Sequence, residues 1–411
     1  MDSAGSKAFW ALTLILALLV SVTCIPLAVV EAQPEHWWDD GYYYRWQVDV
    51  TNNMAGDALP AGYPVKLVMD TVTDDMHDDG YDLRVVYWDG SNHELDRHLI
   101  DMNTAETEVW FQTYASISAG STDDEYYIYY KNATATNPPD DLIDVFVPNK
   151  DANTQALYYF EDGSGITLTD YSDNSNTGTL TNMEVEDWVT GKHGEALNFD
   201  GTNEYVEVPD DSSLSITGEI TIEAWVKQTS VESWAAIVTK GTSATWNSNN
   251  YVMGLQSGKP DFRWNGTGSV LADDVLSTDV WYHLAFVAET GTTNALKIYV
   301  NDNLVKQGNR TGNPTANNQA LHIGSDDGTS DNFNGVIDGV RISNTAKSSF
   351  PYGAVSSEPS AALKGAPTPI PEIPIGPIAI VALGVGLFGL FRWRSRRTDS
   401  GLAKSDLAQI G

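Results

Sequence analysis

The clearest alternation of apolar and polar positions lies between residues 191 and 228. Two runs in this stretch, 205–208 and 220–226, place every second side chain on one face of an extended strand. Turn-forming Asp, Gly, Pro and Ser residues separate the two runs. The pattern predicts antiparallel β-sheet, with buried faces formed by Val206, Val208, Ile220, Ile222, Ala224 and Val226.

Similar short strand-like runs fill most of the chain. They occur from residue 34 to about 150, and they resume from about 155 to 350 after a Pro-Pro-Asp-Asp linker at 138–141. The 13 Trp, 19 Tyr and 34 Gly residues favour twisted sheet over helix. We therefore predict an all-β protein with two domains of antiparallel sheet, at 34–150 and 155–350.

The N-terminal segment is apolar from residue 8 to residue 30 and ends in the small-residue sequence Val30-Glu-Ala32. This pattern is typical of a secretory signal peptide, which predicts residues 1–32 as a signal cleaved after Ala32. The length of the run also fits an uncleaved membrane anchor, because about 20 apolar residues span a bilayer.

The C-terminal segment contains a second apolar span, residues 373–391, followed at once by four arginines. An apolar span with basic residues on one side predicts a transmembrane helix with the tail, 392–411, on the cytoplasmic side. The proline-rich residues 351–372 before it predict an extended spacer. The sequence therefore predicts a single-pass membrane protein with both β-domains outside the cell.

The charge of the chain is strongly negative, with 56 acidic and 23 basic residues and a net charge of -33. Nucleic-acid binding is disfavoured, because phosphate contacts require clustered Lys and Arg. The acidic residues come as doublets along the whole chain, which indicates a solvated surface. The single cysteine, Cys24, lies in the predicted signal, so the mature protein has no disulfide.

Three sequence motifs in the second predicted domain resemble those of one protein family. They are Phe199-Asp-Gly with the following Tyr-Val-Glu-Val-Pro, Ala224-Trp-Val, and Phe333-Asn-Gly-Val-Ile-Asp-Gly-Val-Arg-Ile. These motifs are similar to those of LamG-like jellyroll domains in the concanavalin A-like lectin/glucanase superfamily. The resemblance implies a β-sandwich that recognises a carbohydrate or protein ligand.

Two further resemblances concern the rest of the chain. Asp82-Leu-Arg84 resembles the central motif of an uncharacterised bacterial and archaeal β-domain that often precedes LamG-like modules. Tyr129-Tyr-Lys-Asn132 departs from the glycine of that family's closing motif, and no activity of the family is known. Pro371-Glu-Ile-Pro with the apolar span and arginines resembles a PEF-CTERM-type archaeal sorting signal, which implies cleavage near Pro371 as an alternative to a retained helix.

Three alternating positions, Glu219, Thr221 and Glu223, resemble the E-x-D-x-E strand of glucanases in the same superfamily. In those enzymes the resemblance assigns the first Glu as nucleophile and the last as acid/base. Thr221 replaces the middle Asp here, and position 223 corresponds to a variable outer position of the LamG-like pattern. We therefore predict a solvent-facing, catalytically inert pair and no enzyme activity.

Asp338 stands between Val336 and Val340 on one predicted face of its strand, with Arg341 on the other face. A desolvated carboxylate needs a partner. The glucanase resemblance implies a structural calcium ion, with Asp338 as carboxylate ligand and carbonyl oxygen from the Asp200-Gly201 turn. The alternative, in which Asp338 accepts hydrogen bonds from the backbone of a nearby turn, stays open.

Three tryptophans, Trp234, Trp246 and Trp264, lie in or near polar loop-like segments. Aromatic rings in loops can stack on sugars, so these residues are the predicted ligand-binding positions, with ordinary loop packing as the alternative. Three N-glycosylation sequons begin at Asn132, Asn265 and Asn309.

Together these features and resemblances predict a membrane-anchored cell-surface protein of two jellyroll-type β-sandwich domains. It is expected to recognise or adhere to a surface glycan or protein without catalysis. A structural component of the cell envelope is the alternative, and a glycoside hydrolase is a third possibility that rests on Glu219 and Glu223 alone.

Overall fold

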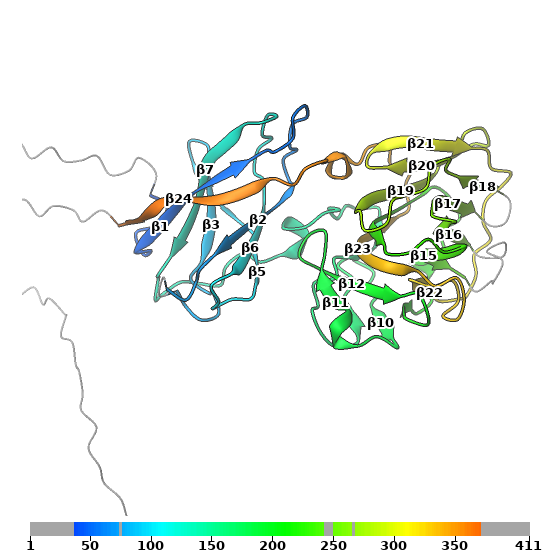
Figure 1. Cartoon of the computed structure of the whole chain (residues 1–411), viewed down its shortest axis with the longest axis horizontal. Helices are drawn as coiled ribbons and strands as arrows, with labels where there is room; N and C mark the ends of the chain where they lie inside the picture. The colour runs from blue at the N-terminus through cyan, green and yellow to red at the C-terminus, as the bar shows by residue number, and fades with distance from the viewer. Residues whose placement is uncertain (1–36, 74–75, 242–249, 265–267, 371–411) are drawn as a thin grey trace, which may run out of the picture. The chain divides into compact units, whose positions relative to one another are not determined.

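The computed structural model describes residues 37–73, 76–241, 250–264 and 268–370. All of these residues belong to one compact unit. Their strands form four antiparallel sheets, which pair into two sandwiches (Figure 1). The predicted all-β fold is therefore confirmed for the described part of the chain.

The first sandwich packs a five-stranded sheet against a three-stranded sheet. In spatial order, the larger sheet contains β24 (Ser360–Pro369), β1 (Tyr44–Thr51), β7 (Thr122–Tyr130), β3 (Arg84–Trp88) and β4 (Asn92–Leu95). The smaller sheet contains β2 (Pro64–Met69), β6 (Thr107–Gln112) and β5 (His98–Ile100).

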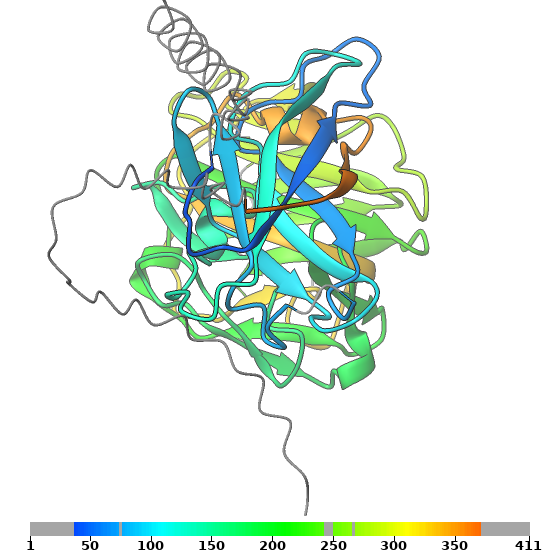
Figure 2. The same cartoon turned by 90° about the vertical axis from the view of Figure 1, so that its left-hand side faces the viewer.

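The edge strand β24 comes from the far end of the described chain. It runs antiparallel to β1, with Thr51 opposite Ser360 and Tyr44 opposite Pro369, and the two strands lie side by side in Figure 2. Its residues fall in the segment expected to be an extended spacer. Proline does not prevent this pairing, because an edge strand leaves one row of backbone groups unpaired. The second sandwich is thus inserted between β7 and β24 of the first.

The second sandwich consists of two larger sheets, which we call the front sheet and the back sheet. In spatial order, the front sheet contains β18 (Gly268–Leu271), β17 (Lys259–Trp264), β16 (Tyr251–Gln256), β15 (Trp234–Lys240), β22 (Leu321–Ile323), β13 (Tyr205–Val208), β10 (Gly178–Thr181) and β9 (Thr167–Leu168). The back sheet contains β11 (Trp188–Thr190), β12 (Glu195–Asp200), β23 (Asn334–Ser343), β14 (Ile220–Gln228), β19 (Tyr282–Ala288), β20 (Leu296–Val300) and β21 (Asn303–Gly308), and β8 (Thr154–Tyr158) also pairs with β23.

Short 3-10 turns connect the strands of both sandwiches. They are η1 (Leu142–Asp144), η2 (Val185–Asp187), η3 (Ser212–Leu214) and η4 (Pro351–Ala354). Between residues 37 and 370, within the described ranges, no helix is long and apolar enough to cross a membrane. The predicted signal 1–32, helix 373–391 and tail 392–411 lie outside those ranges.

The core of the second sandwich follows the predicted alternation. Ile220, Ile222, Ala224 and Val226 of β14 all point into it, and Val206 and Val208 of β13 meet them from the front sheet. The alternate side chains of β14, including Glu223 and Trp225, therefore lie on the outer face of the back sheet.

A β-bulge interrupts the alternation of β23. Its register against β14 shifts between Glu223 and Trp225, and the bulge contains Gly339, whose φ of 56° is left-handed. Because of the extra residue, Ile337 and Val340 both enter the core. Asp338 and Arg341 consequently share the outer face, and the prediction that they lie on opposite faces was wrong.

Candidate functional site

The two glutamates of the glucanase-like motif have different environments. Glu223 is fully buried on the outer face of the back sheet, beneath η4. Arg341 donates from Nε to Glu223 Oε1 at 2.9 Å, and the Tyr352 hydroxyl also donates to its carboxylate. Burial alone would raise the pKa of Glu223, but the charge of Arg341, together with the interactions of His283 and Tyr352, outweighs it and holds the pKa at about 2.

The predicted solvent exposure of Glu223 was therefore wrong, because η4 covers a position that the strand pattern alone leaves open. Glu219 precedes β14 and accepts hydrogen bonds from the backbone N–H and hydroxyl of Thr290, at 3.1 and 3.0 Å. A glycosidase acid needs a raised pKa and contact with the substrate. Glu223 has a lowered pKa and is buried away from the surface, so the two residues do not form a catalytic pair.

The carboxylates of Asp338 and Glu161 both accept hydrogen bonds from the backbone at the loop between β11 and β12. Asp338 Oδ2 accepts from the backbone N–H groups of Lys192 and His193, at 2.8 and 3.1 Å. The Glu161 carboxylate accepts from the backbone N–H of Glu195 at 3.1 Å. The backbone-capping alternative for Asp338 is thus the arrangement that the structure contains.

The two carboxylates remain poorly compensated. Burial raises the pKa of Glu161 well above its ordinary value, and the neighbouring Asp338 charge raises it further. Burial likewise raises the pKa of Asp338 to about 7. His98 lies 3.5 Å from Glu161, but burial lowers the pKa of His98 to about 4, so its ring is neutral at pH 7.

The predicted calcium ligands do not come together. Asp200 pairs with Asn334, four residues before Asp338, which corresponds to roughly 13 Å along the strand. Asp200 Oδ1 instead accepts from the backbone N–H of Thr202 at 2.6 Å and closes its own turn with Gly201. The ligand set of Asp338, Asp200 and Gly201 was therefore wrong, and the sequence reading missed Glu161, whose signal was an acid directly after an apolar strand.

The three tryptophans that were predicted to stack on a ligand lie in different environments. Trp264 is fully buried in the core, because β17 continues its alternation from Phe262, so its ring cannot contact a ligand at the surface. Trp234 begins β15 and is half-buried, with the Arg263 guanidinium 4.6 Å from its ring centroid. Trp246 lies outside the described residues.

The sequons remain predictions. Asn132 is half-buried, and its Oδ1 accepts from the backbone N–H and hydroxyl of Thr134 at 2.9 and 3.0 Å. Asn309 is exposed, and its Oδ1 accepts from the backbone N–H of Asn294 at 2.9 Å. Asn265 lies outside the described residues.

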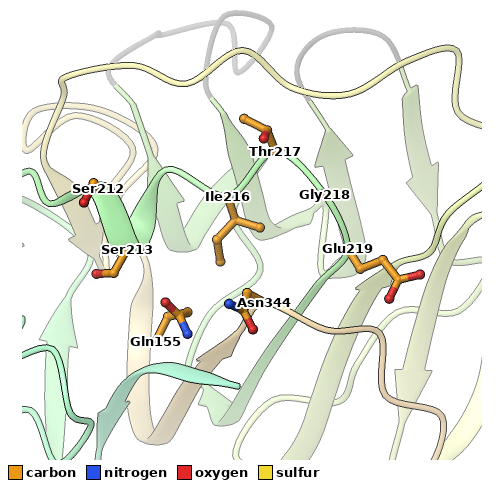
Figure 3. Close-up of a pocket in the computed structure, with 8 residues that line it drawn as sticks. All are labelled: Gln155, Ser212, Ser213, Ile216, Thr217, Gly218, Glu219 and Asn344. Carbon is orange, nitrogen blue, oxygen red and sulfur yellow. The ribbon is translucent and has the colours of Figure 1, made fainter. Parts of the chain in front are cut away.

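A polar pocket of about 260 Å³ opens at one end of the second sandwich (Figure 3). It is built from the edge of β8, the loop from η3 to β14 and the residue after β23. Figure 3 shows Gln155, Ile216 and Asn344 facing the same space, with Glu219 at its side. The lining residues are Gln155, Ser212, Ser213, Ile216, Thr217, Gly218, Glu219 and Asn344.

The pocket offers both hydrogen-bond donors and acceptors. Within the described residues, the Asn344 amide and the hydroxyls of Ser212 and Thr217 make no side-chain hydrogen bond to protein. Gln155 uses its Nε2 on the Asn153 carbonyl at 3.1 Å, which leaves its oxygen as an acceptor. Ile216 is the apolar wall, and Glu219 is the only carboxylate among the described lining residues.

Trp234 does not belong to this pocket. The opposite end of β15, at Lys240, is the end near the pocket, because Lys240 Nζ donates to Asp210 Oδ1 at 2.6 Å, two residues before Ser212. Trp234 is six residues further back along the strand, or roughly 20 Å. A ligand contact at Trp234 would therefore be a separate one.

Residues 200–349 match the family model of the concanavalin A-like lectin/glucanases superfamily. The predicted LamG-like resemblance is confirmed over this range, and the second sandwich is a lectin-like sandwich. The resemblances of residues 34–150 and of the C-terminal segment stay predictions. No curated protein matches the chain.

Solved structures similar to this chain include domain 4 of AbnA, a GH43 extracellular arabinanase from Geobacillus stearothermophilus, in complex with arabinotriose. The two are 20% identical over 50% of this chain and 98% of that one, with a TM-score of 0.40. The binding domain of Paraclostridial Mosquitocidal Protein 1 is 14% identical over 47% of this chain and 49% of that one, with a TM-score of 0.38. Trypanosoma rangeli sialidase in complex with the inhibitor DANA is 12% identical over 64% and 42%, with a TM-score of 0.38. The match thus spans about half or less of the last two chains.

Proposed function

We propose that the lectin-like sandwich is a non-catalytic recognition module that binds a neutral saccharide in the pocket of Figure 3. The observation that carries this proposal is the mixture of unpaired amide and hydroxyl groups around Ile216. A sugar hydroxyl both donates and accepts, so it is matched by side chains such as Asn344 and Gln155 that do the same. One apolar wall suits the C–H face of a pyranose or furanose ring.

The same pocket argues against hydrolysis. Cleavage of a glycosidic bond normally requires two carboxyl groups on either side of the bond. Glu219 is the single carboxylate among the described lining residues, and its hydrogen bonds to Thr290 lower its pKa, which keeps it ionised and unsuited to act as an acid.

Binding of neutral oligosaccharides by the purified protein tests the proposal. We expect saturable binding on a glycan array, confirmed by calorimetry, without turnover. Asn344→Ala should weaken the binding about tenfold, because one buried side-chain hydrogen bond to the ligand is lost. Gln307→Ala, an exposed amide on β21, is the matched control and should leave the affinity unchanged. Equal affinity of the two variants, or release of product that stops in Glu219→Gln, would refute the recognition role.

We further propose that this module is displayed outside the cell, with the predicted signal 1–32 removed and the segment 373–391 as membrane anchor. The support is the apolar span and its arginines in the sequence. Protease added to whole cells should release fragments of residues 34–350, and the intact mass of the extracted protein should show whether cleavage near Pro371 has occurred. Full protection of residues 34–350 would contradict this topology.

A structural calcium ion is also proposed, with Glu161 and Asp338 as its carboxylate ligands. Both side chains are buried and bind backbone N–H groups at the same loop, and the Lys192 charge near Asp338 does not offset the burial, so the two carboxylates lack sufficient compensating positive charge. Bound calcium would supply that charge and tie β8 and β23 to the loop between β11 and β12.

Without calcium, the raised pKa values predict a stability that depends on pH in a defined direction. A carboxyl whose folded pKa is raised stabilises the protein fully below its unfolded pKa, 3.8 for Asp338, and this stabilisation is lost as the pH rises through about 7. In chelator, the free energy of unfolding should therefore fall by about 4 kcal/mol between pH 4 and pH 7 from Asp338 alone, and Tm should fall with it.

Calcium should restore Tm at pH 7, since it binds only the folded protein. Glu161→Gln should abolish this response, whereas Asp200→Asn, at the other end of the strand pair, should retain it. A wild-type Tm that is the same in calcium and in chelator would exclude the site.

A further inference from the structure

A cleft of about 380 Å³ lies where both sandwiches and the segment leading into β24 meet. Ligand sites in proteins commonly occupy cavities of about 300–1,000 Å³ at such junctions. Four chain segments that are separate in sequence line the cleft. Its residues are Pro64, Lys66, Val68, Trp110, Thr190, Gly191, Lys192, Glu358, Pro359, Ser360 and Ala361.

Two ammonium groups lie at this cleft. Lys66 Nζ pairs with Glu108 Oε1 at 2.8 Å and lies 5.5 Å from the centroid of the Trp110 ring. Lys192 Nζ pairs with Glu358 and lies 4.7 Å from the Trp225 ring. An ammonium group has three donor hydrogens, and within the described residues each of these lysines uses one on a carboxylate. Both side chains are therefore held in place with donors left for a ligand.

The other strong polar groups of the cleft are already paired. Glu358 accepts from the Tyr63 hydroxyl at 3.1 Å as well as from Lys192, and the Trp110 indole N–H donates to Glu108 Oε2 at 2.9 Å. Both carboxylates are thus engaged by groups of the protein, and the remaining ammonium hydrogens of Lys66 and Lys192 are donors left for a ligand. A neutral sugar hydroxyl would have to donate as well as accept, whereas a carboxylate only accepts. The cleft therefore matches an acceptor-rich ligand.

The remaining wall of the cleft is apolar. Pro64, Val68 and Pro359 line it, and Val68 is 48% exposed. A uronic-acid ring has a C–H face that can pack against such a wall and a carboxylate at its edge. In a chain of net charge -33, an acidic glycan meets repulsion over most of the surface, so its carboxylate needs local ammonium donors such as those of Lys66 and Lys192, each of which already shares its charge with one glutamate.

We propose that this cleft is a second binding site, and that it takes an acidic saccharide whose uronate carboxylate accepts hydrogen bonds from Lys66 and Lys192. The site is independent of the neutral-saccharide pocket of Figure 3, since the two share no lining residue. It also gives the first sandwich a direct part in recognition.

The test is calorimetric titration of the full-length protein with trigalacturonate and with the same trisaccharide after reduction of its carboxyl groups to alcohols. We expect trigalacturonate to bind, and the reduced form to bind at least ten times more weakly. Lys66→Met and Lys192→Met should each weaken trigalacturonate binding about tenfold, because a charge-assisted hydrogen bond is lost. Lys66→Arg should retain most of the affinity, because the positive charge and a donor are kept.

Two controls separate this site from other causes. Lys150→Met removes a lysine that pairs with Asp173 outside the cleft, and it should leave the affinity unchanged. Asn344→Ala should also have no effect on trigalacturonate, which distinguishes this proposal from the neutral-saccharide pocket. The Tm of each variant shows that it is folded. Equal binding of the reduced trisaccharide, unchanged affinity in the folded Lys66→Met and Lys192→Met variants, or no binding of trigalacturonate would each overturn the proposal.

Discussion

A fragment that ends at residue 359 should unfold its first sandwich at a clearly lower temperature than a fragment that ends at residue 370. The shorter fragment lacks β24, which pairs with β1 along the whole of that strand and packs Ala361 and Leu363 against the core. Burial of Leu363 alone contributes about 1–2 kcal/mol. For a domain of this size, that corresponds to a Tm decrease of roughly 5–15 °C.

Limited proteolysis and calorimetry of the two fragments check this expectation. Cleavage in the shorter fragment should concentrate in residues 37–130, because loss of β24 also leaves the β1 edge open to solvent and to pairing with other chains. The lectin-like sandwich is the internal control, since none of its strands lies after residue 343, and its own transition should not move. Identical melting and cleavage of both fragments would show that β24 is dispensable.

The strands that could be predicted from the sequence are those whose alternation is local. The inward positions of β13 and β14 were predicted correctly, because Val206, Ile220 and their neighbours repeat with a period of two and bury against each other. The pairing of β24 with β1 could not be predicted in this way. Its partner is some 310 positions earlier in the chain, and prolines at 367 and 369 favour a spacer in any local reading.

The outer face of the back sheet is a second region that could not be predicted from the sequence. A single bulge at Gly339 moved Asp338 and Arg341 to one face, and no local pattern marks a bulge that depends on pairing with β14. Glu223 occupies a position that alternation assigns correctly to the outer face, but its burial results from η4, more than 120 residues later. The candidate pocket likewise combines Gln155, Ile216 and Asn344, which only the folded chain brings together.

Removal of one partner of the Glu223–Arg341 pair should strongly destabilise the lectin-like sandwich. Both side chains are buried, and Arg341 also donates to the Asn149 carbonyl and to the Tyr352 hydroxyl, so the pair joins β14 and β23 to the segments before β8 and after β23. Arg341→Met leaves the Glu223 carboxylate buried without its cation. Such a loss typically costs about 3–5 kcal/mol, or a decrease of roughly 10 °C in the Tm of a domain of about 200 residues.

The same pair should make the stability of the lectin-like sandwich depend on pH in acid. The folded pKa of Glu223, about 2, lies below its ordinary 4.5, so the stabilisation is complete above pH 4.5 and is lost as the pH falls toward 2. The difference corresponds to about 3 kcal/mol. Urea unfolding of the wild type between pH 5 and pH 2 should show this decrease, and Glu223→Gln, which does not titrate, should show a flatter profile.

A double variant distinguishes the pair from general disruption of the region. Glu223→Leu combined with Arg341→Met removes both charges and keeps most of the side-chain volume, so it should recover most of the stability that either single variant loses. Urea unfolding gives the four free energies of the cycle, and we expect a coupling energy of at least about 2 kcal/mol. If the losses of the two single variants simply add in the double variant, the residues stabilise the sandwich independently, and the ion pair is not what fastens η4 to the back sheet.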